Sequence, residues 1–128
     1  MRHRGFTLLE MIVVLAILGL ATALVAPSAL RGIDSWRRRA ELDSLLDQIR
    51  ALPGNARASG RAIVLSDGAL KSKDAPLRIA SGWTLSVPTP WKVNANGVCL
   101  GGQVSIGNSY GSRTIVVAAP FCDPILRP

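Results

Sequence analysis

Residues 5–27 read GFTLLEMIVVLAILGLATALVAP, and this stretch decides how the rest of the chain is organised. Between Phe6 and Ala26 the run contains a single charged residue, Glu10. As an α-helix rising about 1.5 Å per residue it would be roughly 31 Å long, close to the hydrocarbon core of a bilayer at about 30 Å. A basic leader, residues 1–5, precedes it. The sequence therefore predicts a membrane-embedded helix at the N-terminus.

Three interpretations of this run differ in how they explain Glu10. A secretory signal needs an uninterrupted apolar segment and a small-residue cleavage site; Ala21-Thr22-Ala23 would serve as the site, but Glu10 interrupts the segment near its start. A plain membrane anchor must tolerate an acid that costs about 2.5–3.5 kcal/mol at the centre of a span and less near the headgroups. In the third interpretation the chain is cut after Gly5, and Glu10 meets the new α-amino group of Phe6 in a neighbouring copy. A buried carboxylate needs such a positive partner.

A family resemblance favours the third interpretation. The segment Gly5-Phe6-Thr7-Leu8-Leu9-Glu10, followed by an apolar run and Pro27, resembles the N-terminus of type IV pilins and of type II secretion pseudopilins. The resemblance implies that a prepilin peptidase cleaves after Gly5 and methylates the new N-terminal Phe6. It also implies that Glu10 aligns subunits during filament assembly.

Length and composition allow one domain. The chain has 128 residues, and the part beyond the apolar run is long enough for one modest hydrophobic core. Only 5% of the residues are aromatic, so this core must be built mainly from Val, Ile, Leu and Ala. The formal charge is +7, from 15 Lys and Arg against 8 Asp and Glu. Such a balance suits nucleic acid, anionic lipid or an acidic partner, although a solvated cationic face is the more ordinary explanation.

No residue pattern in the chain indicates catalysis or a metal site. The single histidine, His3, lies in the leader, and two cysteines without another histidine do not make a zinc site. Gly101-Gly102 is too short a signal for a phosphate-binding loop and is interpreted as a turn before a strand. We therefore expect a protein that is not an enzyme and that needs no cofactor. Four acids on the predicted helix are interpreted as a solvated face: Asp34, Glu41, Asp43 and Asp47.

The two cysteines are expected to form a disulfide. An even pair in a small exported domain is typical of such a bridge, and a bond between Cys99 and Cys122 would contribute about 3 kcal/mol in the chain-entropy model. The alternative is two free buried thiols.

The spacing of a predicted hairpin supports the disulfide. Residues 103–107 and 113–119 are interpreted as two strands separated by a turn. If the hairpin folds about Tyr110 and Gly111, residues whose numbers sum to 221 face each other. Ser105 would then face Val116, and the two cysteines would lie opposite each other near disulfide distance.

Residues 28–52 are rich in helix formers, and Pro53-Gly54 is expected to stop or bend the helix. Pro27 is expected to bend the helix or loosen a turn where it leaves the membrane. Our hypothesis is that one apolar group faces other subunits and that a second, nearly opposite group packs on the chain's own sheet. The alternative is a break near Arg39 that gives two separate helices. At about 100° per residue the two groups are Leu30, Ile33, Trp36 and Ala40, and Leu42, Leu45, Ile49 and Leu52.

The remaining segments predict a fold of the α+β class: a long N-terminal helix, membrane-spanning in its first half, packed on a small, mostly antiparallel sheet, as in pilins. An irregular tail over residues 120–128 is expected to be held mainly by Cys122. Short strands are expected at residues 61–66, 77–80, 83–87 and 91–93, with turns at Asp67-Gly68 and at residues 94–97.

The second half of the chain resembles, more diffusely, the H-type minor pseudopilins and their minor-pilin relatives. The likeness lies in residues 40–65 and in the glycine-rich turn and strand at residues 96–106. It implies four regions: a leader over residues 1–5, a membrane-spanning and filament-core helix over residues 6–27, its amphipathic continuation over residues 28–54, and a periplasmic β-sheet head over residues 55–128.

The resemblance implies a minor pseudopilin of a type II secretion system, a structural subunit near the tip of the periplasmic pseudopilus that helps to move folded proteins across the outer membrane. Its partners would be other pseudopilin subunits, the prepilin peptidase, the inner-membrane assembly platform and secreted cargo. The precursor would cross the bacterial inner membrane once, with a cytoplasmic N-terminus and a periplasmic head. Arg2 and Arg4 favour this orientation under the positive-inside rule, whereas Arg31 and Arg37-Arg38-Arg39 favour the reverse.

A rival function is that of a minor type IV pilin for pilus biogenesis or DNA uptake, with a basic head that binds DNA. Lys92, Arg113 and Arg127 would then form a C-terminal phosphate-binding patch, and binding would fall steeply with salt. The arginines are scattered along the chain, and no basic cluster is interleaved with aromatic residues. Nucleic acid is therefore the less favoured partner.

Overall fold

The computed structural model describes residues 4–127. They fall into two units, residues 4–39 and residues 40–127, and each is described by itself. One helix, α1 (Leu8–Ser59), passes through the boundary between the units without interruption. The alternative with a break near Arg39 is therefore wrong.

The first unit consists of the irregular residues 4–7 and the N-terminal part of α1. Among the described residues, α1 is the helix that is long and apolar enough to cross a membrane. It is helical on both sides of Pro27, although a proline inside a helix cannot donate a backbone hydrogen bond. The bend expected at Pro27 stays a prediction.

The helix continues past Pro53-Gly54 and ends at Ser59, so the expectation that it stops there is wrong, while the alternative of a bend stays a prediction. A proline in a helix interior costs about 3 kcal/mol. Here Leu52, Pro53 and Ala56 are all buried, and this packing outweighs the local penalty. Gly60 follows the helix with a positive φ of 66°, and its N–H donates to the Ala56 carbonyl at 2.9 Å.

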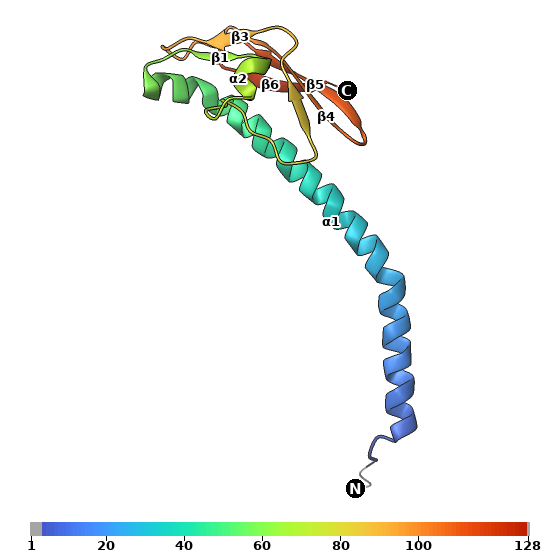
Figure 1. Ribbon diagram of the computed structural model, residues 1–128. Coiled ribbons are helices and arrows are strands. Elements are labelled where there is room, and N and C mark those ends of the chain that lie inside the picture. Colours follow the sequence, from blue (N-terminus) through green and yellow to red (C-terminus); the bar gives the residue numbers. More distant parts are fainter. Residues whose placement is uncertain (1–3, 128) are drawn as a thin grey trace. The chain divides into compact units, whose positions relative to one another are not determined.

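The second unit adds strands and one short helix to the C-terminal part of α1 (Figure 1). Strands β1 and β3 form a two-stranded sheet. The other strands form a four-stranded sheet with the order β2-β4-β5-β6. Every pairing is antiparallel, which confirms the predicted α+β fold of a long helix and antiparallel strands, although the strands form two sheets rather than the one expected. The elements are β1 (Ile63–Leu65), α2 (Asp67–Leu70), β2 (Thr84–Ser86), β3 (Trp91–Val93), β4 (Gly102–Asn108), β5 (Gly111–Ala118) and β6 (Asp123–Arg127).

One face of α1 shares a hydrophobic core with both sheets. Four helix residues at helical spacing are each at most 1% exposed: Leu45, Ile49, Leu52 and Ala56. This confirms that the second apolar group of the helix packs on the chain's own sheets. The strands contribute Leu65, Trp91, Val93, Val104, Ile106, Ile115 and Val117.

Two short segments differ from expectation. Residues 77–80 are not a strand, because the side chain of Gln48 on α1 takes the place of a strand partner. Its Nε2 donates to the Arg78 carbonyl at 2.9 Å, and the Arg78 N–H donates to its Oε1 at 2.8 Å. Asp67-Gly68 is not a simple turn but opens α2, since the Ser66 hydroxyl accepts the Ala69 N–H at 3.2 Å as an N-cap.

We expect Gln48→Ala to lower the free energy of unfolding of the second unit by about 1–2 kcal/mol, because two hydrogen bonds of about 1 kcal/mol each are lost. The urea midpoint of the full chain in detergent, followed by tryptophan fluorescence, measures the effect. Gln103→Ala is the matched control, since the Gln103 side chain is exposed on β4. Equal midpoints for the two variants would show that Gln48 does not hold the segment.

The hairpin of β4 and β5 has a different register from the one predicted. Ser105 pairs with Thr114 rather than with Val116, because the turn is tighter than expected and Asn108 already pairs with Gly111. The register is displaced by two residues. Alternate residues share a face of a strand, so this displacement leaves the same side chains facing the core.

The expected irregular tail is wrong for residues 123–127. These residues form β6, which pairs with β5, and Leu126 packs against the core. The sequence analysis did not predict this strand because it contains Pro124, and a proline has no backbone N–H to donate to a neighbouring strand. A proline is tolerated here because β6 is an edge strand of the four-stranded sheet.

Candidate processing and assembly site

The bond between Gly5 and Phe6 lies in the irregular segment before α1. The Phe6 side chain is 74% exposed, and a Cβ added at Gly5 would meet no atom within 4 Å. A peptidase needs an extended stretch of chain and would otherwise have to unwind a helix. The bond is therefore presented where a peptidase can reach it with α1 intact.

Thr7 caps α1 directly after this bond. Its Oγ1 accepts the Glu10 N–H at 3.2 Å, and its carbonyl accepts the Met11 N–H at 3.2 Å. The sequence analysis did not predict this cap, although Thr7-Leu8-Leu9-Glu10 has the spacing of a capping box. The cap places Glu10 in the first turn of α1, where a carboxylate also interacts favourably with the helix dipole. Cleavage after Gly5 would leave this cap in the protein.

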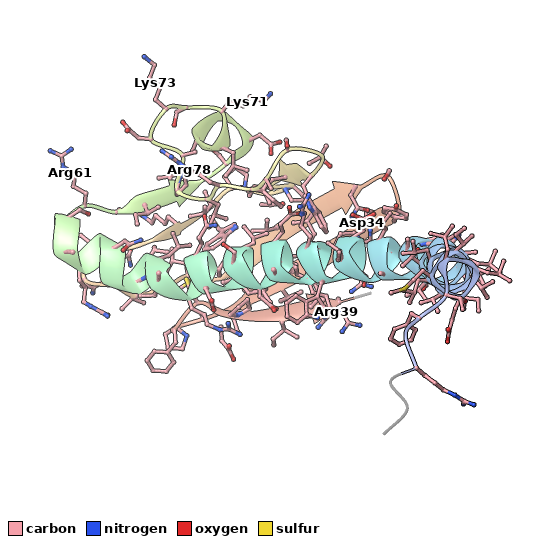
Figure 2. All side chains as sticks on the ribbon, turned by 90° about the horizontal axis from the view of Figure 1, so that it is seen from below. Asp34, Arg39, Arg61, Lys71, Lys73 and Arg78 are labelled. Atoms are coloured by element: carbon pink, nitrogen blue, oxygen red, sulfur yellow. A yellow bond between two sulfur atoms is a disulfide. The ribbon has the colours of Figure 1, made fainter. Side chains whose placement is uncertain are left out.

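The apolar side chains of α1 in the first unit are exposed on all sides of the helix (Figure 2). Leu8 is 82% exposed, and the run stays exposed along its whole length. A helix that is hydrophobic all round is stable only when it is buried. Lipid or other helices must therefore cover this surface.

The first apolar group of the amphipathic continuation is also uncovered. Leu30, Ile33 and Trp36 are exposed, and Trp36 is 80% exposed. That other subunits cover this group stays a prediction.

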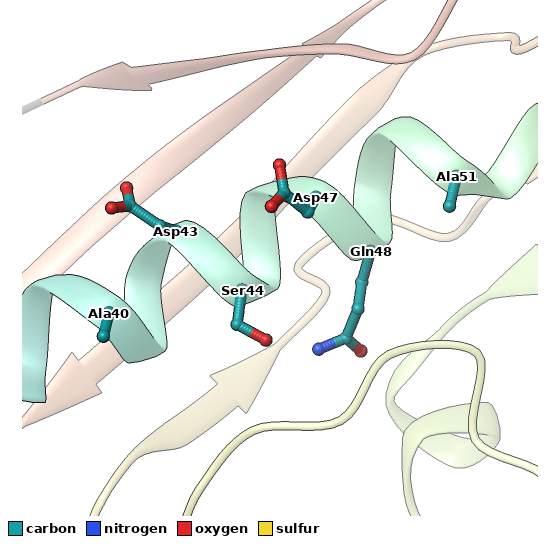
Figure 3. A pocket seen from close by; sticks show the side chains of 6 residues that line it. All are labelled: Ala40, Asp43, Ser44, Asp47, Gln48 and Ala51. Carbon is teal, nitrogen blue, oxygen red and sulfur yellow. The ribbon is translucent and has the colours of Figure 1, made fainter.

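Open depressions lie on the described part of the second unit. One, of about 650 Å³, lies on the face of α1 that points away from the sheets, lined by Ala40, Asp43, Ser44, Asp47, Gln48 and Ala51 (Figure 3). Another, of about 550 Å³, lies beside α2, and its lining includes the basic residues Lys71, Lys73 and Arg78. Neither is lined by a histidine or a cysteine. In residues 4–127 no three His, Cys, Asp or Glu side chains gather as a metal site would require.

The three basic residues of the suggested phosphate-binding patch are not brought together. Lys92 lies on β3 in the two-stranded sheet, whereas Arg113 and Arg127 lie in the four-stranded sheet. Arg127 pairs with Thr114 and shares its face, so Arg113, the residue next to Thr114, lies on the opposite face. Other cations also point outward (Figure 2): Arg61 before β1, and Lys71 and Lys73 together in the turn after α2.

Cys99 and Cys122 form a disulfide with their Cα atoms 5.4 Å apart, which confirms the predicted pair. The backbone arrangement that brings the two cysteines together differs from the prediction. Cys99 lies opposite Pro120, whose carbonyl accepts the Cys99 N–H at 2.9 Å. Cys122 comes two residues later and reaches back with a positive φ of 56°. The turn after β5 brings the sulfur atoms together, rather than direct opposition across the hairpin.

We expect replacement of both cysteines by alanine to lower the free energy of unfolding by about 3 kcal/mol. The bond joins residues 23 apart in the sequence, and this is the stabilisation that the entropy model gives for such a loop. The urea midpoint of the full chain measures the loss. Dithiothreitol is the control, since it should lower the midpoint of the unmodified chain and leave that of the variant unchanged. A variant as stable as the oxidised chain would contradict the prediction.

A comparison with known families decides what the N-terminus is. Residues 1–26 match the family model described as the prokaryotic N-terminal methylation motif. The chain carries a type IV pilin-like prepilin signal. No curated protein and no solved structure matches the chain.

The prepilin signal implies processing by a prepilin peptidase and assembly with other pilin-like subunits. The long apolar helix that follows fits anchoring of the chain in a membrane. The match includes Gly5, Phe6 and Glu10 without assigning a role to any of them. Cleavage after Gly5, methylation of Phe6 and alignment of subunits by Glu10 stay predictions.

Proposed function

We propose that this protein is a minor pseudopilin of a type II secretion system, a structural subunit near the tip of the periplasmic pseudopilus and not an enzyme. The observation that carries the proposal is the apolar part of α1, which is exposed on all sides and lies within the residues that match the prepilin signal. Such a surface is stable in lipid and in a bundle of similar helices. The same helix can therefore anchor the precursor and later form the filament core.

Processing would prepare the helix for this transfer. Cleavage after Gly5 releases residues 1–5 and gives Phe6 a positive α-amino group. A carboxylate such as that of Glu10 is costly in lipid, and a positive partner from a neighbouring copy offsets that cost. An assembly platform in the inner membrane would then move α1 sideways from lipid into the bundle.

The second unit suits a role as a rigid head outside the inner membrane. Its core spans α1 and both sheets, and the Cys99–Cys122 bond ties the end of β5 to the segment before β4. Disulfides persist in oxidising compartments such as the periplasm. The head would present its surface to other minor subunits or to secreted cargo.

The diffuse likeness of residues 40–65 and 96–106 is to H-type minor pseudopilins and to their minor-pilin relatives, and of these two we propose the secretion role. DNA uptake receives less support, since Lys92, Arg113 and Arg127 lie on different sheets or faces.

Deletion of the gene in the native host tests the proposal. We expect secretion of folded proteins to stop while piliation and DNA uptake continue, and the unmodified chain must restore secretion. Normal secretion with lost piliation or DNA uptake would contradict the proposal and favour a minor type IV pilin.

A further inference from the structure

We infer that the depression beside α2 binds an extended acidic segment of another protein, whose carboxylates pair with Lys71, Lys73 and Arg78. This depression, of about 550 Å³, is called the α2 depression below. The inference rests on the proposed function for one point only, that the second unit meets other proteins. It adds which surface they meet and which chemistry that surface recognises.

The segment that borders the α2 depression is long, irregular and firmly held. Residues 71–83 join α2 to β2 without a helix or strand of their own. Connections longer than about 12 residues without secondary structure are uncommon in compact domains, and they are usually either functional or disordered. Here Gln48 on α1 bonds both the N–H and the carbonyl of Arg78, and Arg78 Nη2 donates to the Lys73 carbonyl at 3.2 Å. These bonds fix the segment, which favours a functional role.

Positive charge is in excess around the α2 depression. Its lining includes three cations, Lys71, Lys73 and Arg78, and one acid, Asp67. The Asp67 carboxylate already accepts the backbone N–H of the residue after β2, at 2.7 Å. Asp74 belongs to the same segment but does not line the depression. All three cations are exposed, and within residues 4–127 none of them forms a salt bridge, so their charge is open to a ligand.

Apolar side chains also line the α2 depression. Leu70, Ile79 and Leu85 are half-buried, with one side of each packed against the core. The remaining part of these side chains is open to solvent. A ligand that covered it would remove apolar surface from water in addition to pairing its charges. The depression therefore fits a chain that carries apolar side chains as well as carboxylates.

The placement of the cations favours several carboxylates over one phosphate. Lys71 and Lys73 leave the turn after α2 in different directions (Figure 2), so their charges do not converge on one point. In an extended peptide, side chains two residues apart lie about 7 Å from each other on one face. Carboxylates on such a peptide can therefore be spaced to reach separate cations.

Two other anionic partners fit less well. Single-stranded nucleic acid binds by stacking its bases on aromatic side chains, and among the described residues none that lines the α2 depression is aromatic. A flat layer of lipid headgroups would meet the protruding lysines without covering the apolar side chains between them. An acidic peptide segment is the partner that uses both kinds of side chain.

Fluorescence anisotropy of a labelled peptide tests the inference on the full chain in an uncharged maltoside detergent. The probe is a short capped peptide in which glutamate and leucine alternate. We expect saturable binding that weakens with added salt, because exposed charges are screened over about 8 Å at physiological ionic strength. Glutamine in place of glutamate should weaken binding about tenfold or more, and serine in place of leucine several-fold. Absence of saturable binding at low salt would overturn the inference.

Charge reversal locates the site on the chain. Lys71→Glu combined with Lys73→Glu should weaken binding of the peptide about tenfold or more, since each reversal removes an attraction and adds a repulsion, and an exposed pair contributes up to about fivefold. The matched control combines Lys92→Glu with Arg127→Glu, which changes the net charge equally at exposed positions on β3 and β6. It should weaken binding less than about twofold. An equal loss in both variants would mean that the peptide senses only net charge, and the site would be wrong.

The urea midpoint shows whether these variants stay folded. All four substituted side chains are exposed, so each variant should keep the midpoint of the unmodified chain. If the reversal of Lys71 and Lys73 lowers the midpoint, Lys71→Gln combined with Lys73→Gln removes the two charges without adding repulsion. This milder pair should still weaken binding about two- to 25-fold, and unchanged binding would contradict the site.

Competitors identify the occupant. Inorganic phosphate, a single-stranded oligonucleotide and phosphatidylglycerol in the micelles are each added to the unmodified chain and to the lysine variants. If one of them binds more tightly than the peptide, and only when Lys71 and Lys73 are present, the acidic segment is the wrong occupant. If none of them does, the acidic segment is supported.

Deletion of the gene separates this inference from the proposed function. If deletion stops secretion and the peptide does not bind, the α2 depression has no such role and the proposed function stands. If the peptide binds at the two lysines while deletion leaves secretion intact, the secretion role is wrong and the peptide site remains.

Discussion

Gly5→Leu should leave the chain uncleaved and lower the amount of processed protein by about 100-fold or more. The chain itself has room for the new side chain, since a Cβ at Gly5 would meet no atom within 4 Å. The defect must therefore arise in the active site of the peptidase, where displacing a reacting bond by about 1 Å can cost about 100-fold in rate. The effect of the smaller Gly5→Ala depends on the peptidase.

Intact mass measures this outcome, because an uncleaved chain retains residues 1–5 and lacks the added methyl group. Gly19→Leu is the matched control. Gly19 lies in the exposed apolar part of α1, and a Cβ there also meets no atom within 4 Å, so this variant should be processed normally. Equal processing of the two variants would mean that the cleavage site is not at Gly5.

Glu10→Ala should leave cleavage intact and lower incorporation into filaments by about 100-fold or more. In the proposed bundle Glu10 neutralises the α-amino group of a neighbour, away from water. Removing one member of a buried pair costs about 3–5 kcal/mol, and each 1.4 kcal/mol is about tenfold in an equilibrium constant. The start of α1 should not be affected, because Thr7 Oγ1 binds the backbone N–H of residue 10, which alanine retains.

Two measurements on the same cells separate the steps. Intact mass reports on cleavage and methylation, and the fraction of the protein that crosslinks to other pseudopilin subunits in the cells reports on incorporation. Asp34→Ala is the control, since Asp34 is an exposed acid on α1 beyond the apolar run (Figure 2). If the Glu10→Ala and Asp34→Ala variants were incorporated to the same extent, the charge-pairing role of Glu10 would be contradicted.

In the second unit, the strands that could be predicted from the sequence are those in which apolar and polar residues alternate along a short segment. Trp91–Val93 alternates buried and exposed residues and forms β3, and the two strands of the last hairpin lie close to their predicted positions. Residues 77–80 have a comparable apolar pattern without a strand. Their backbone bonds to Gln48, which is 30 residues away from Arg78 in the sequence, and no local pattern indicates such a contact.

The sequence by itself determined the apolar helix of membrane length, the acid near its start and the prepilin signal around Gly5 and Phe6. These are properties of contiguous residues, since hydrophobicity, length and motif spacing need no knowledge of the remaining chain. The sequence also predicted the Cys99–Cys122 disulfide correctly. The register assumed for the β4–β5 hairpin in that prediction was wrong by two residues.

Only the tertiary structure decided where α1 ends, how the strands divide into two sheets, and that the C-terminal residues form β6. The reason is the same in each case. The penalty at Pro53 is outweighed by contacts with the sheets, and the strand containing Pro124 is stabilised by pairing with β5. Both outcomes depend on free energy from residues that are distant in the sequence and adjacent only after folding.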